Sequence, residues 1–93
     1  MLISHSSDGD MLQVTLHRHL DIATRAAAVQ EIEALIHAHR PRWVTLSVPD
    51  GEPAPATLST ALRLHRMCQN LGIALDLTGA SAAMQRPFHT NTA

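Results

Sequence analysis

Several features that common protein classes require are scarce in this sequence. Its 93 residues include one cysteine, Cys68, which excludes an internal disulfide and a cysteine-based zinc site. They include two aromatic residues, Trp43 and Phe88, and seven basic residues, all of them arginines scattered along the chain. A nucleic-acid-binding surface needs a basic stripe or stacking rings. The sequence therefore predicts neither a disulfide framework nor a nucleic-acid partner.

Long apolar runs and a charge imbalance are missing as well. No apolar run approaches the roughly 20 residues of a membrane-spanning helix, and the N-terminus lacks the basic start and apolar block of a signal peptide. A lone cysteine fits a reducing compartment, so we expect a cytoplasmic protein. The chain is 45% hydrophobic and 16% charged, with a formal net charge of −1. This composition and length predict one globular domain over 1–93, with a single core.

The spacing of apolar residues predicts strands that alternate with helices. A period of two, typical of strands, occurs from Met11 to His19, in "WVTLSV" and in "IALDL". Helical spacing occurs over 23–40 and 58–72, and 80–86 is a shorter helix candidate that Pro87 ends. "DGD" separates two apolar runs as a hairpin connection does. Residues 88–93 are predicted to be a frayed tail.

Each predicted helix has one apolar stripe. The stripe of the first consists of Ala28, Val29, Ile32, Leu35 and Ile36. The stripe of the second consists of Leu58, Ala61, Leu62, His65, Cys68 and either Leu71 or Gly72. Asp21 or Thr24 is expected to cap the first helix, and Pro41 to stop it.

Together the elements predict an α/β fold. Strands joined through helices imply right-handed crossovers and parallel neighbours. All three main strands alternate instead of being apolar throughout, so the helices should cover mainly one face of the sheet. We therefore expect a mixed sheet of four or five strands with one open face. The residues expected on that face are Thr15, His17, His19, Thr45, Ser47, Asp76 and Thr78.

Candidate catalytic and metal-binding residues are few. His17 and His19 lie two apart on a predicted strand and point the same way, but a metal site needs further ligands with suitable spacing. Cys68 and His65 are three apart on a helix, yet no acid is placed to orient the histidine. We interpret Cys68 as a packed core residue. The sequence predicts no enzyme activity, no metal and no cofactor.

Four segments share their order and spacing with a known family. They are "RHLDIAT", "RPRWVTLSV", "LSTALRLHRMCQNLGIALDLTG" and "LTGASAAM". Together they resemble the STAS domain, a small module shared by anti-sigma factor antagonists and the cytoplasmic tails of sulfate transporters. The resemblance covers about residues 10–86 and implies a STAS-like α/β domain.

The loop before the second predicted helix departs from that family. In partner-switching antagonists it resembles Asp-Ser-Ser-Gly-Leu, and its serine accepts phosphate from a kinase-type anti-sigma factor. Aligning on Leu58 puts Ala54 at the aspartate. Pro55 and Ala56 then stand at the two serines, and Thr57 at the glycine. Because alanine and proline have no hydroxyl, the resemblance implies a domain that is not switched by phosphate in the usual way.

Two residues near this loop have alternative interpretations. Thr57 is a candidate for a displaced phosphoacceptor, whereas ordinary capping at the helix start is the simpler explanation of the hydroxyls of Thr57, Ser59 and Thr60. Asp21 matches a surface acid that helps STAS domains to contact a partner, and it also fits a helix N-cap. These two roles of Asp21 are compatible.

The resemblance implies a non-enzymatic protein–protein interaction module, an anti-sigma factor antagonist-like regulator of transcription without the phosphorylated serine. Its partner would be a kinase-type anti-sigma factor or a phosphatase. The partner-binding residues would be Asp21, Ala54, Pro55, Ala56, Thr57, Leu58 and Ser59. The alternative is a cytoplasmic accessory subunit of a membrane transporter, and a ligand carrier or minor enzyme using the open sheet face is a third hypothesis. The short last helix would leave part of a groove bare, which favours a homodimer or a partner helix.

Overall fold

A computed structural model describes residues 2–49, 54–79, 85, 86, 88 and 89 of the protein. Its strands are β1 (Ile3–Asp8), β2 (Met11–Leu16), β3 (Trp43–Ser47) and β4 (Ala74–Thr78), and its long helices are α1 (Ile22–His39) and α2 (Pro55–Asn70). The four strands form one sheet in the order β1-β2-β3-β4. β1 is antiparallel to β2, and β2, β3 and β4 are parallel. The predicted α/β class and mixed sheet are confirmed.

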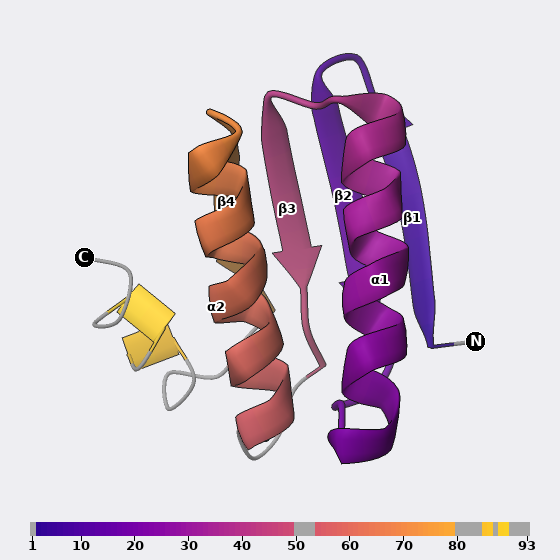
Figure 1. Cartoon of the computed structure of the whole chain (residues 1–93), viewed down its shortest axis with the longest axis vertical. Coiled ribbons are helices and arrows are strands. Elements are labelled where there is room, and N and C mark those ends of the chain that lie inside the picture. The colour runs from indigo at the N-terminus through magenta and orange to yellow at the C-terminus, as the bar shows by residue number, and fades with distance from the viewer. Residues whose placement is uncertain (1, 50–53, 80–84, 87, 90–93) are drawn as a thin grey trace.

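Both helices lie on the same face of this sheet (Figure 1). α1 passes over the β1–β2 side, and α2 covers β4. The core lies between the two layers, and the strand residues that form it are Ile3, Leu12, Val14, Leu16, Val44, Leu46, Leu75 and Leu77. Apart from Ile3, these are the apolar positions of the period-two alternation, so the prediction that the helices cover mainly one face is confirmed.

Two glycines occupy positions where the backbone leaves little room for a side chain or has a positive φ. Gly9 has φ +61° in the turn that pairs Asp8 with Met11, which confirms the predicted hairpin. Gly79, with φ +73°, ends β4 against the backbone that follows β3. A Cβ at this position would lie 2.8 Å from the Val48 carbonyl oxygen, so no larger residue fits without moving the backbone.

The apolar stripe of α2 differs from the predicted one. α2 begins at Pro55, three residues before the predicted start, because proline suits the first helical position. The stripe prediction is right for Ala61 and Cys68, but it omits residues that are fully or almost fully buried, namely Thr57, Thr60 and Leu64. Leu71, expected in the stripe, is 49% exposed. The buried stripe is rotated by about one position from the predicted one. Leaving out the two threonines as polar shifted the prediction toward Leu58, Leu62 and His65, and Leu64 was missed with them.

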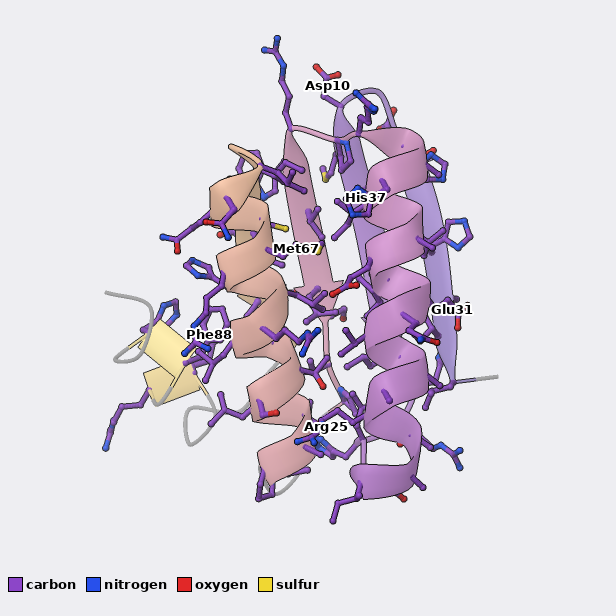
Figure 2. All side chains as sticks on the ribbon, in the orientation of Figure 1. Asp10, Arg25, Glu31, His37, Met67 and Phe88 are labelled. Atoms are coloured by element: carbon purple, nitrogen blue, oxygen red, sulfur yellow. The ribbon has the colours of Figure 1, made fainter. Side chains whose placement is uncertain are left out.

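The C-terminal segment also departs from the prediction. Phe88, expected in a frayed tail, is 2% exposed and belongs to the core. Its ring meets the His65 ring edge to face, with 5.8 Å between the ring centroids. Figure 2 shows Phe88 against the flank of α2. Residues 80–84 of the predicted last helix, together with Pro87 and 90–93, lie outside the described residues.

The face of the sheet away from the helices is polar apart from two large side chains. Met11 is 41% exposed and Trp43 is 49% exposed. The Trp43 indole N–H donates to Asp76 Oδ2 at 3.0 Å, across two parallel strands. The placement of His19 on this face was wrong, because β2 ends at Leu16 and the His19 ring turns toward α2.

Candidate functional site

The predicted partner-binding residues gather at one edge of the sheet. Parallel strands end at the same edge, so the segments after β2 and β3 are brought together there. The segment after β2 leads through Asp21 into α1, and the segment after β3 leads through Ala54 into α2. Both helix starts lie at the lower end of Figure 1. The structure thus brings together residues that are more than thirty positions apart in sequence.

A buried hydroxyl joins the two segments. Thr57, in the first turn of α2, is 0% exposed, and its Oγ1 accepts the backbone N–H of Leu20 at 2.8 Å. The same oxygen lies 3.3 Å from His19 Nδ1. A hydroxyl both donates and accepts, so the direction of this second hydrogen bond is set by the His19 tautomer. Thr57 therefore fixes the start of α2 to the backbone just before α1.

This position bears on the phosphoacceptor hypothesis. A kinase needs a hydroxyl that it can reach, and the Thr57 hydroxyl is enclosed and hydrogen-bonded. Neither Thr57 nor Ser59 caps α2, since the N-cap is Ala54 and no side chain bonds there. Ser59 is exposed, and its oxygen accepts from Arg25 Nη1 at 3.3 Å. The hydroxyls of Thr57 and Ser59 therefore make tertiary hydrogen bonds and do not cap the helix.

Asp21 is the N-cap of α1, as predicted for one of the two candidate caps, Asp21 and Thr24. Its Oδ1 accepts the Thr24 backbone N–H at 2.9 Å, and its own N–H donates to Thr24 Oγ1 at 3.0 Å. This reciprocal pair forms a capping box. The hydrogen bond from the Thr24 backbone, followed by the one from the Thr24 hydroxyl, holds the pKa of Asp21 below its ordinary value of 3.8.

We expect the Asp21 cap to make stability depend on pH in the acid range. Its folded-state pKa is lowered, so its charge stabilises the fold above the ordinary pKa, and that contribution is lost as pH falls through the folded value. Asp21→Asn should melt below the wild type at pH 7, and the gap should narrow as the pH falls below the ordinary Asp21 pKa of 3.8. Thermal unfolding followed by circular dichroism across pH 2–7 measures this. A gap that stays constant with pH would show that the charge of Asp21 has no role.

An exposed isoleucine lies beside this cap. Ile22 is 86% exposed, the most exposed large hydrophobic residue among those described. The first turn of α1 extends past the edge of the sheet, so no strand lies beneath it (Figure 1). At the start of α2, Pro55 is also exposed and Leu58 is half-buried. The sequence analysis missed Ile22, although its place directly after a cap and before the apolar stripe was a usable signal.

The other candidate side chains do not form a catalytic or metal-binding group. Cys68 is fully buried, and burial raises the pKa of its thiol to about 11, so the thiolate that a nucleophile needs is scarce at neutral pH. His17 hydrogen-bonds to Ser4 at 2.8 Å, away from His19. Within the described ranges no three histidine, cysteine or acidic side chains converge as metal ligands would.

Comparisons with known proteins do not place the chain in a family. No protein-family model matches it, and no curated protein matches it. Among the described residues, neither helix has the length and apolar character needed to cross a membrane. The fold and the site therefore define an α/β domain whose two helices present a partly apolar end, without a visible catalytic group in the described part of the chain.

Proposed function

We propose that the protein is a non-enzymatic protein-binding module, and that its partner docks on the end where α1 and α2 begin. The docking surface consists of Asp21, Ile22, Ala54, Pro55 and Leu58. The observation that carries the proposal is the 86% exposure of Ile22 at the same end of the domain as the exposed Pro55 and the half-buried Leu58, since grouped apolar side chains at a surface are stabilised by being covered. The neighbouring exposed carboxylate of Asp21 would add orientation and specificity.

The resemblance to STAS domains supports a narrower proposal. The module would act in the cytoplasm as an anti-sigma factor antagonist-like regulator and would bind a kinase-type anti-sigma factor or a phosphatase. Pro55 and Ala56 offer no hydroxyl to such a kinase, and Thr57 is enclosed behind the surface. Binding would then be constitutive and would not be switched by phosphate. Thr57 would serve by holding the two helix starts in register.

Site-specific cross-linking tests the docking surface. A photoreactive residue at position 22 should capture a partner in cells of the native organism, and the same residue at position 31 should not. Glu31 is the matched control because it lies on α1 but points away from α2 and the docking surface (Figure 2). A captured kinase or phosphatase supports the antagonist-like role, and a captured permease supports the transporter-subunit alternative.

A purified partner allows a quantitative test. Ile22→Arg should weaken its affinity about tenfold or more, because burying an isoleucine side chain contributes roughly 1.5–3 kcal/mol. Glu31→Arg should change it less than about twofold. Equal effects of the two substitutions, or capture at position 31 alone, would contradict the proposed surface.

A further inference from the structure

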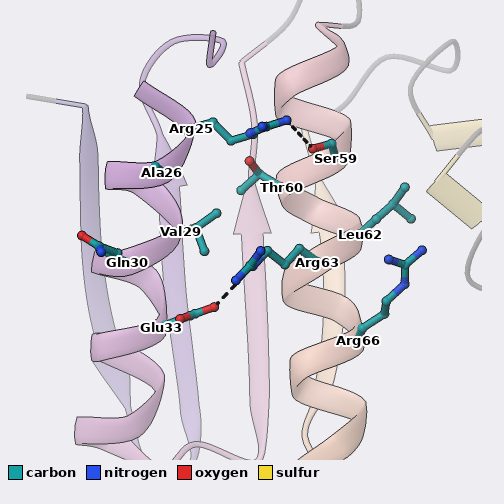
Figure 3. Close-up of a pocket in the computed structure, with 10 residues that line it drawn as sticks. All are labelled: Arg25, Ala26, Val29, Gln30, Glu33, Ser59, Thr60, Leu62, Arg63 and Arg66. Atoms are coloured by element: carbon teal, nitrogen blue, oxygen red, sulfur yellow. Dashed lines mark hydrogen bonds and ion pairs between the residues drawn. The ribbon is translucent and has the colours of Figure 1, made fainter. Parts of the chain in front are cut away.

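A groove of about 730 Å³ lies between α1 and α2 on the side away from the sheet. Figure 3 shows the side chains that line it, drawn from both helices. Arg25 reaches across it from α1 and Arg63 reaches across it from α2, one above the other in the view. Its volume falls within the roughly 300–1,000 Å³ typical of small-molecule sites. The docking surface proposed above does not include these residues.

The groove is positively charged although the chain as a whole is not. Three of the seven arginines, Arg25, Arg63 and Arg66, line it with a single carboxylate, that of Glu33. The whole chain carries a formal charge of −1. Positive charge is therefore concentrated here by the fold, because these arginines are scattered in sequence. Such a concentration attracts anions.

The existing contacts leave most of that charge uncompensated. Arg25 donates to the neutral hydroxyl of Ser59. Arg63 Nε lies 3.6 Å from Glu33 Oε1, and the Arg63 side chain is 69% exposed. Arg66 makes no hydrogen bond or ion pair with the part of the chain that the structure describes. Guanidinium groups in this state are free to bind the oxygens of an oxyanion through paired N–H groups.

A second, independent feature marks the floor of the groove. Thr60 is 1% exposed, and its Oγ1 is buried without a hydrogen-bond partner. Figure 3 places Thr60 between Arg25 and Arg63, with its hydroxyl oxygen turned toward the space between the helices. Buried hydroxyls without partners are rare because each costs about 1–3 kcal/mol. The oxygen itself has almost no exposed area, so a ligand oxygen in the groove satisfies it only when the side chains that line the groove move aside.

We propose that this groove binds a phosphate monoester, with the phosphate between Arg25 and Arg63 and against the Thr60 hydroxyl. Two guanidinium groups match a dianion better than a carboxylate, which carries one charge. Val29 and Leu62 provide apolar walls beside the arginines for the organic part of the ester. Arg66, on the same helix face as Leu62, adds charge at the rim. The site does not depend on the proposed partner-binding function.

Titration of the full ¹⁵N-labelled chain at low ionic strength tests this assignment. Inorganic phosphate and phenyl phosphate are the probes, and acetate, benzoate and an octa-glutamate peptide are the comparison anions. Saturable shifts are expected in the amide signals around Thr60 and Arg63, with phenyl phosphate binding more tightly than benzoate. Arg25→Gln and Arg63→Gln should each weaken phenyl phosphate binding about ten- to a hundredfold, the loss expected for a charged hydrogen bond.

Two further variants separate the site from general surface charge. Thr60→Val keeps the shape of a buried side chain and should weaken binding about tenfold or more, as loss of a hydrogen bond to a charged acceptor does. Arg42→Gln removes an arginine that pairs with Asp10 outside the groove, and it should change binding less than about twofold.

Three results would overturn the anion site itself. They are the absence of saturable shifts with either phosphate, an equal loss in Arg42→Gln and Arg63→Gln, and an unchanged affinity in Thr60→Val. Tighter binding of benzoate than of phenyl phosphate would overturn the choice of phosphate. Binding of octa-glutamate without phosphate binding would overturn it in favour of an acidic protein segment.

Discussion

Replacing Phe88 with alanine should lower the free energy of unfolding by about 3–5 kcal/mol, as other buried Phe→Ala substitutions do. The ring is 2% exposed and packs into the same core as the sheet and both helices. Its removal loses burial and leaves a space beside His65 that the surrounding side chains fill only partly. A small domain has roughly 5–15 kcal/mol in all, so this one side chain supplies a large share.

Urea unfolding at equilibrium measures this loss, with Arg86→Ala as the control from the same segment. Arg86 is exposed, and its truncation should change stability by less than about 0.5 kcal/mol. A loss under about 1 kcal/mol in Phe88→Ala would mean that the segment is frayed in solution, as the sequence suggested. An intermediate value would indicate that the core partly closes around the missing ring.

Thr57→Val and Thr60→Val should change stability in opposite directions, although both residues are buried in α2. Thr57 accepts the Leu20 N–H, so valine leaves a buried backbone donor unpaired and should cost about 1–3 kcal/mol. Thr60 Oγ1 has no partner, so valine removes an unsatisfied group without changing the shape of the side chain. This substitution should stabilise the unliganded protein by about 1 kcal/mol.

The two variants act as controls for each other. They share a helix, a residue type and near-zero exposure, so helix propensity and apolar burial change alike. The sign of each effect then reports on the hydrogen bond alone. Urea unfolding of both variants and of the double variant measures the effects. Destabilisation of similar size at both positions would show that the Thr60 hydroxyl has a hydrogen-bond partner in the unliganded protein. The hydroxyl would then not be available to a phosphate in the groove.

The sequence was sufficient for the α/β class, the hairpin, the alternation of the strands and the cap at Asp21. Those features depend on local rules, namely the periods of two and 3.6 residues, glycine in a tight turn and hydrogen bonds between residues three apart. Asp21 was placed at a helix start correctly for that reason, whereas Ala54, the N-cap of α2, was predicted to lie in the loop before a helix that begins at Leu58. That the helices cover one face also followed from alternation in the strands.

Contacts between distant segments decided the rest. Thr57 is buried and hydrogen-bonds to the segment before α1, and is not a surface hydroxyl, because Leu20 lies beside it in the fold. Phe88 is in the core because it packs against the flank of α2. Ile22 is outside the core because the sheet ends before it reaches the first turn of α1. The groove exists only because α1 and α2 pack side by side, which brings Arg25 and Arg63 together. Local patterns show which side chains favour burial, but the tertiary structure alone determines where surface exists to bury them and which charges become neighbours.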